Sequence, residues 1–345
     1  MGETKPDKIR VPEFLSGYGE LGALIRSADW TKTDLGPPAS WPNSLKTVAR
    51  IMLDSRYAIW IGWGSDLTFL YNDAYRAMTL GKKHPWALGK PAREVWAEAW
   101  SDLGPRVEAV VQHGTATYDE DLFLLLERSG YPEETYHTFS YSPLPDDNGN
   151  LGGLLCIVVE DTDRHIAERR LTVLRETASQ IANHRESNEL FAAIGSCIGA
   201  NTFDVLFSLI YLIEPDGQSA RLVSRTGIDG RHPAAPSVIT ISATAGAWPI
   251  DELLARSDTL IVDDLAQRFT DLPVGAWDVS SRRAAVIPIA NQGQDQPAGV
   301  LIIGLNPYRP FDDAYRGFIN LLAGQIAAGL ADVRAYEEEK NAPKP

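Results

Sequence analysis

The sequence has little of several things that would define a function class. It contains only two cysteines, Cys156 and Cys197, and no apolar run of the roughly 18 residues needed to span a bilayer as a helix. Basic residues are also few, since 32 Lys and Arg stand against 46 Asp and Glu, for a net charge of -14. Such a surface repels phosphate backbones and anionic headgroups. We therefore expect a cytoplasmic protein without a disulfide framework, a membrane span or a nucleic-acid partner.

Catalytic motifs are incomplete. Gly17, Gly19 and Gly22 match the dinucleotide-binding glycine pattern, but Pro12 interrupts the strand that should precede them. Cys197 stands between two glycines, as a hydrolase nucleophile would, yet a helical pattern precedes it where that motif needs a strand. The six histidines lack metal-ligand spacing. No catalytic constellation and no metal site follow from the sequence, and a hydrolase that uses Cys197 remains only a third hypothesis.

Hydrophobic patterning predicts a first sheet domain. Residues 1–43 read as an N-terminal extension with a short helix, and residues 44–162 as the domain itself. A helix is predicted over Ser44–Leu53, where apolar residues recur at spacings of three and four. Two strand patterns, a helical stretch and three further strand patterns follow, the last two joined by a turn with an Asn-Gly pair. This order favours one antiparallel sheet with helices on one face.

Two helices with heptad-like apolar spacing frame a second sheet domain. Residues 163–188 are predicted as a linker helix, residues 189–336 as a domain of hairpins that ends in a long helix, and residues 337–345 as a tail. The linker positions are Ala167, Leu171, Leu174, Ala178 and Ile181, and those of the final helix are Ile319, Leu322, Ile326, Gly329, Val333 and Tyr336. Pairing with a second copy and packing against the helix's own domain both remain open.

Aromatic residues crowd the first domain. Large rings with a few polar atoms can line a cavity for a small molecule, and they can equally fill a core. The candidate ligand-binding residues are Trp60, Phe69, Tyr71, Tyr75, Trp96, Tyr136 and Phe139, with Tyr211 in the second domain.

Several segments carry a resemblance to known families. WIGWGSDLTFLYNDAYRAM, KHPWALGKPAREVWAEAW and GYPEETYHTFSYSPLPDDNGNLGG resemble a PAS domain of bacterial sensor histidine kinases. VVEDTDRHIAERRLTVLRE is similar to the closing strand and signalling helix of that family, with Glu160, Asp161 and Thr162 at its D-[IV]-T junction. FSLIYLIEPDGQSARLVS and PAGVLIIGLNPYRPFDDAYRGF resemble a GAF domain.

The resemblance implies an α+β chain with two antiparallel-sheet sensor domains, PAS-like then GAF-like, joined by a helical linker. It implies the signal-input region of a cytoplasmic two-component sensor histidine kinase, in which a bound small molecule or partner changes the conformation of a homodimer. The implied relay runs through Glu160, Asp161 and Thr162 into Leu171, Leu174 and Ile181. The sequence stops at KNAPKP without a phosphoacceptor histidine or ATP-binding boxes. We therefore expect either a sensory fragment with a kinase core downstream or a stand-alone sensor.

The cofactor is not specified by the sequence. The N-C-R-F-L-Q motif of flavin-cysteinyl relatives is missing, and Cys197 lies in a helical setting unsuited to bilin attachment. Haem stays open, because a single axial histidine has no spacing signature. The alternative function is a dimerisation or protein-interaction module that binds no small molecule.

Overall fold

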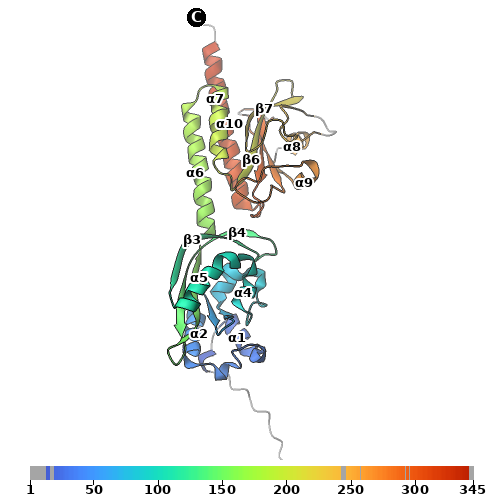
Figure 1. Cartoon of the computed structure of the whole chain (residues 1–345). Coiled ribbons are helices and arrows are strands. Elements are labelled where there is room, and N and C mark those ends of the chain that lie inside the picture. The colour runs from blue at the N-terminus through green and yellow to red at the C-terminus, as the bar shows by residue number, and fades with distance from the viewer. Residues whose placement is uncertain are drawn as a thin grey trace, which may run out of the picture. The chain divides into compact units, whose positions relative to one another are not determined.

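The computed structural model describes residues 13–15, 19–241, 246–256, 258–291, 293–294 and 296–341, and the chain divides into two compact units (Figure 1). Unit 1 is Met1–His165 and unit 2 is Ile166–Pro345. Each unit combines helices with one sheet in which all paired strands are antiparallel. The predicted α+β class with two antiparallel sheets is confirmed.

The sheet of unit 1 has the strand order β2-β1-β5-β4-β3. Its strands are β1 (Ala58–Trp63), β2 (Thr68–Tyr71), β3 (Thr117–Leu126), β4 (Glu133–Pro145) and β5 (Leu151–Glu160). The helices are α1 (Glu20–Ser27), α2 (Asn43–Asp54), α3 (Asp73–Tyr75), α4 (Ala92–Val95) and α5 (Trp100–His113), with short turns η1 (Glu13–Leu15), η2 (Trp30–Lys32), η3 (Pro38–Ser40), η4 (Arg76–Leu80), η5 (Gly81–Lys83) and η6 (Ala97–Ala99).

Helices cover both faces of this sheet, so the prediction of helices on one face is wrong. Every residue of β1 is buried, and its side chains alternate between two apolar clusters. Trp60 joins the cluster with α5, whereas Ile59 and Ile61 join a cluster with Trp30 and Trp41. A strand that is apolar on both faces needs cover on both, and the N-terminal segments supply the second layer.

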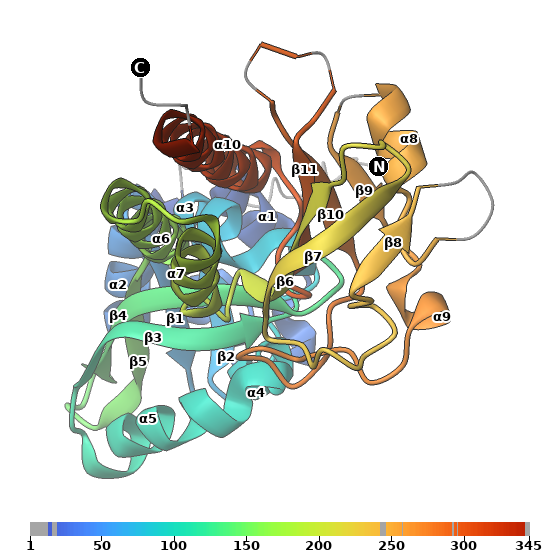
Figure 2. The same cartoon turned by 90° about the horizontal axis from the view of Figure 1, so that it is seen from above.

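The sheet of unit 2 has the strand order β8-β7-β6-β11-β10-β9. Its strands are β6 (Val205–Ile213), β7 (Ser219–Thr226), β8 (Val238–Thr240), β9 (Leu260–Val262), β10 (Ala284–Ile289) and β11 (Gly299–Leu305). The helices are α6 (Thr162–Asn183), which begins in unit 1, α7 (Ser187–Gly199), α8 (Ile250–Arg256), α9 (Leu265–Arg268) and α10 (Asp313–Asn341). Figure 2 shows α6, α7 and α10 together on one side of this sheet. The sequence patterns did not indicate β8.

The two heptad-like stripes have different surroundings. On α10, Ile319, Leu322 and Ile326 are buried in the core of unit 2. Gly329 packs against Ile181, so closely that a Cβ added to the glycine would lie 2.9 Å from Ile181 Cγ2. These four positions of the α10 stripe therefore pack within their own domain, which is one of the two arrangements that the spacing left open, whereas Tyr336 of the same stripe is exposed.

On α6 the buried face is not the predicted heptad stripe but the face of the helix next to it. It consists of Ile166, Arg170, Val173 and Thr177. Of the predicted stripe, Ala167, Leu171 and Ala178 are exposed, and Leu174 and Ile181 are half-buried. The helix also ends at Asn183, five residues before the predicted boundary at 188.

Candidate functional site

Unit 1 encloses a small cavity between its sheet and the helices that cover one face. The cavity volume is about 30 Å³, which is room for roughly two water-sized groups. It is lined by Trp60, Tyr75, Thr79, Trp96, Leu103, Leu124, Leu126, His137, Phe139, Tyr141, Cys156 and Val158. A volume this small admits a molecule of a few atoms, and anything larger has to displace the walls.

Strand alternation explains which side chains reach the cavity. On β4, His137, Phe139 and Tyr141 are two residues apart and share one face. Cys156 on the neighbouring β5 is the register partner of both Tyr141 and Trp60 of β1. The rings of Trp60 and Tyr141 lie 5.7 Å apart in an edge-to-face arrangement. Three adjacent strands therefore form one aromatic wall.

Two polar side chains in this wall lack hydrogen-bond partners within the described ranges. His137 is 2% exposed and Thr79 is 4% exposed. Neither ring nitrogen of His137 has a hydrogen-bond partner among the described residues, and the hydroxyl oxygen of Thr79 has none there either. Burial lowers the pKa of His137 to about 4, so its ring is neutral at pH 7. Burial also raises the pKa of the thiol of Cys156, which keeps it protonated.

An ion pair between Arg128 and Glu160 lies at the end of β5, where Glu160 is the register partner of His137 on β4. Arg128 donates from its two terminal nitrogens to the two carboxylate oxygens of Glu160, both at 2.6 Å, and from Nε to Glu133 at 3.1 Å. Burial raises the pKa of the Glu160 carboxyl, but the hydrogen bonds and charge of Arg128 outweigh it and hold that pKa below its usual range. The guanidinium is thus engaged by two carboxylates.

The first residue of α6 is tied to this ion pair. Thr162 donates its hydroxyl proton to Glu160 Oε1 at 3.0 Å, and it accepts a hydrogen bond from the backbone N–H of Tyr136 at 3.0 Å. The N–H of Asp161 donates to the carbonyl of Tyr136 at 2.8 Å. Because Tyr136 lies on β4 and Glu160 ends β5, the start of α6 is fastened to both strands that supply the aromatic wall.

The predicted ligand-binding residues fall into four groups. Trp60, Tyr75, Trp96 and Phe139 line the cavity, while Phe69 and Tyr71 are buried in the same cluster without lining it. Tyr136 points to the other face of β4, where its ring stacks on that of His165 with centroids 4.5 Å apart. Tyr211 belongs to unit 2, and its hydroxyl donates to the carbonyl of Pro236 at 2.9 Å.

Sequence reasoning missed the polar part of the cavity, namely Thr79 and His137. The signal for His137 was available, because it stands in phase with Phe139 on a strand whose inward positions are aromatic. Thr79 lies in the π-helical turn η4. The direction of its side chain could not be predicted, because a π-helical turn does not follow the periodicity of an α-helix or a strand.

A buried charge cluster attaches α6 to Asp204, the residue that directly precedes β6. Asp204 is fully buried and accepts hydrogen bonds from Arg169 at 2.6 and 2.9 Å and from Arg170 at 3.2 and 3.0 Å. Asn201 also donates to this carboxylate at 2.9 Å. Burial opposes the charge of Asp204, yet the two guanidiniums keep its pKa below the usual value.

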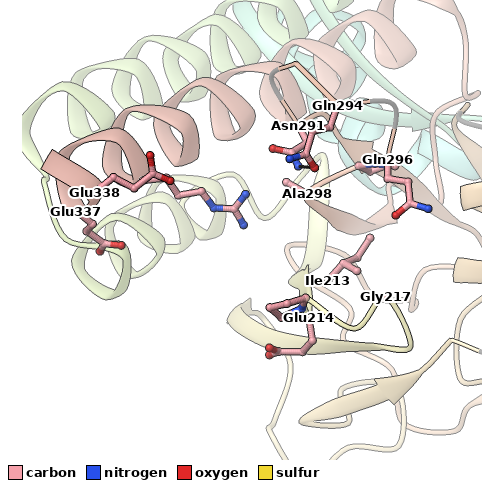
Figure 3. A pocket seen from close by; sticks show the side chains of 12 residues that line it. Ile213, Glu214, Gly217, Asn291, Gln294, Gln296, Ala298, Glu337 and Glu338 are labelled. Carbon is pink, nitrogen blue, oxygen red and sulfur yellow. Dashed lines mark hydrogen bonds between the residues drawn. The ribbon is translucent and has the colours of Figure 1, made fainter. Parts of the chain in front are cut away.

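Two further features of unit 2 are an open groove and a buried cysteine. An open groove of about 790 Å³ lies among the β6–β7 turn, the β10–β11 loop and the end of α10, with Glu214, Glu337 and Glu338 in its lining (Figure 3). Cys197 lies in α7, and burial raises the pKa of its thiol. Among the described residues, no group of three or more His, Cys, Asp or Glu side chains is placed to hold a metal ion, and no helix is long and apolar enough to cross a membrane.

Comparison with known families assigns a domain type to each unit. A family model described as PAS fold matches residues 53–166, and one described as GAF domain matches residues 189–331. The chain therefore contains a PAS domain followed by a GAF domain, both of them sensory domain types.

Of the glycines that match the dinucleotide-binding pattern, Gly17 lies outside the described residues, and Gly19 directly precedes α1.

Several solved structures are similar to about half of the chain. The GAF domain of an Acinetobacter phosphoenolpyruvate-protein phosphotransferase is 17% identical with a TM-score of 0.36, over 48% of this chain and 94% of that chain. Free methionine-R-sulfoxide reductase from Neisseria meningitidis, in complex with its substrate, is 17% identical with a TM-score of 0.38, over 48% and 90%. A methyl-accepting chemotaxis protein fragment is 17% identical with a TM-score of 0.35, over 48% and 99%. No curated protein sequence matches the chain.

Proposed function

We propose that this chain is the signal-input region of a cytoplasmic sensor histidine kinase, which binds a small molecule in the PAS cavity. The occupant contacts Trp60, Tyr75, Trp96 and Phe139 and changes the packing of β4 and β5. The change passes through Glu160, Asp161 and Thr162 into α6, and from there through the GAF domain to a downstream kinase core. The order of a PAS and then a GAF domain supports this proposal.

The observation that carries the proposal is the double hydrogen bond of Thr162. Its hydroxyl joins β4 to β5 at the point where α6 begins. Phe139 on β4 and Val158 on β5 line the cavity a few residues away. An occupant with different affinities for two arrangements of these strands shifts the population between them, and α6 follows because it starts on the same hydrogen bonds.

The exposed stripe of α6 supports a homodimer. Ala167, Leu171 and Ala178 are exposed at heptad spacing on a charged helix, and Leu171 is 65% exposed. Apolar residues at such spacing are the seam through which helices of two copies pair. This same stripe, together with a cavity of only about 30 Å³, favours the second candidate, a dimerisation module without a small-molecule ligand.

Filling the cavity from within the protein tests the proposal without an identified ligand. Val158→Ile adds one methylene at a cavity-lining position of β5, whereas Val159→Ile adds the same group on the opposite, exposed face of that strand. We expect Val158→Ile to change hydrogen exchange of the amides of residues 165–169 in α6 by at least threefold. Val159→Ile should leave them unchanged.

Both outcomes are read by hydrogen-exchange mass spectrometry of the full chain. Equal exchange in α6 for the wild type and both variants would contradict the sensory proposal and leave the dimerisation module as the better account. Exchange in α7 serves as the internal reference.

A further inference from the structure

The PAS cavity combines an apolar wall with polar atoms that have no hydrogen-bond partner among the described residues. A buried donor or acceptor without a partner is destabilising, and such groups are rare in native proteins. Here three such atoms, the two ring nitrogens of His137 and the hydroxyl oxygen of Thr79, belong to side chains that line the same cavity. The cavity has room for roughly two water-sized groups. The simplest explanation of these groups is an occupant that they hydrogen-bond.

The chemistry of these two side chains defines what the occupant carries. A neutral imidazole has one N–H donor and one acceptor nitrogen, and a threonine hydroxyl both donates and accepts. An occupant therefore needs an acceptor for the imidazole N–H and a donor for its other nitrogen. A hydrocarbon would leave all three atoms unsatisfied.

The charges around the cavity exclude an ionic occupant. The charged groups that face His137 are Glu160 at the end of β5, Asp161 next to it, and Arg128. The cation of Arg128 is already held by Glu160 and Glu133. The lining itself has no charged side chain to pair with an ion, and burying an unpaired ion is far costlier than burying a neutral polar group.

We infer that His137 and Thr79 form a hydrogen-bonding subsite for a small uncharged molecule with both a donor and an acceptor, such as an amide or an alcohol. This inference rests on the proposed function, since it names the class of molecule that the PAS cavity senses. Aromatic neighbours surround the apolar part of the molecule, and the polar part faces His137.

Nuclear magnetic resonance of the full chain labelled with ¹⁵N-histidine tests the inference, with formamide as the probe. Formate is the matched control, because it has the same three non-hydrogen atoms but is charged. For three non-hydrogen atoms the dissociation constant is no tighter than about 0.5 mM, so titration across the millimolar range is required. We expect a saturable change in the His137 ring signals with formamide and none with formate.

Two variants separate this inference from the sensory proposal. His137→Leu and Thr79→Val should each weaken formamide binding at least tenfold, as followed by the backbone amide of Phe139 in a second, uniformly ¹⁵N-labelled sample of each protein. A linear, non-saturable response of the wild type would mean that only water occupies the cavity, and it would overturn the inference. Saturable binding that neither variant weakens would also overturn it, while the sensory proposal would stand because a molecule still enters. Failure of the sensory proposal appears separately, as unaltered α6 exchange in Val158→Ile.

Discussion

The buried histidine of the PAS domain has a measurable consequence for stability between pH 7 and pH 5. The pKa of His137 is about 4 in the folded protein, against an ordinary value of 6.5. Over this window the unfolded chain binds a proton at His137 that the folded protein does not, so unfolding becomes more favourable as the pH falls. The stabilisation by neutral His137 is therefore present above pH 6.5 and is lost as the pH falls toward 4.

The magnitude follows from the two pKa values. At pH 5 the unfolded imidazole is almost fully protonated and the folded one is largely neutral, so PAS stability should fall by about 2 kcal/mol from its value at pH 7. Carboxyls with lowered pKa, such as Glu160, contribute in the same direction but mainly below pH 4.5. Substituting His137→Gln removes the histidine contribution and retains those of the carboxyls.

Urea unfolding followed by tryptophan fluorescence measures this difference. Seven of the nine tryptophans lie in unit 1, so the fluorescence reports mainly on the PAS domain. We expect the wild type to lose about 2 kcal/mol more than His137→Gln between pH 7 and pH 5. His113→Gln, at an exposed position that ends α5, is the control and should behave like the wild type.

The reasoning would be refuted if the wild type and His137→Gln lost equal stability over this window. That result would mean that His137 is protonated in the folded protein, with partners for its ring nitrogens that the cavity does not provide.

Two further predictions concern α6. Asp204→Asn leaves two guanidiniums around a neutral amide and should destabilise unit 2 by about 3 kcal/mol, as measured by urea unfolding of the GAF domain. Asp229→Asn is the control, because Asp229 is exposed, and it should change the stability of unit 2 by less than about 0.5 kcal/mol. Leu171→Asp should convert a dimer into a monomer in sedimentation experiments with no loss of unit 2 stability, because the side chain is already exposed. Ile51→Asp, a change at a similarly exposed position on α2, should leave the proposed dimer intact. A dimer that persists in Leu171→Asp would count against the α6 seam.

Most of the secondary structure could be predicted from the local periodicity of apolar residues. The face of the predicted helix formed by Leu45, Val48, Ala49 and Met52 is buried, as the spacing of three and four indicated. The hairpins of both sheets also follow from alternating strands and their turn residues. Such patterns are set by neighbours in the sequence, so the sequence suffices to predict them.

Contacts between distant residues were beyond the reach of that reasoning. Arg128 and Glu160 are 32 residues apart, and Arg169 and Asp204 are 35 apart, with no spacing rule to connect them. The stripe of α10 has the spacing of a coiled-coil seam but packs into its own domain, because periodicity identifies the apolar face and not its partner. Tyr136 was assigned to the cavity by residue type, although its strand position places it on the opposite face.

A double-mutant cycle between Val158 and Thr162 tests most directly whether the cavity communicates with α6. The four proteins are the wild type, Val158→Ile, Thr162→Val and the double variant, compared by the free energy of hydrogen exchange at residues 165–169. We predict a coupling free energy above about 0.5 kcal/mol, because the Thr162 hydroxyl carries the displacement of β5 into the helix. Effects that add to within about 0.3 kcal/mol would contradict this account.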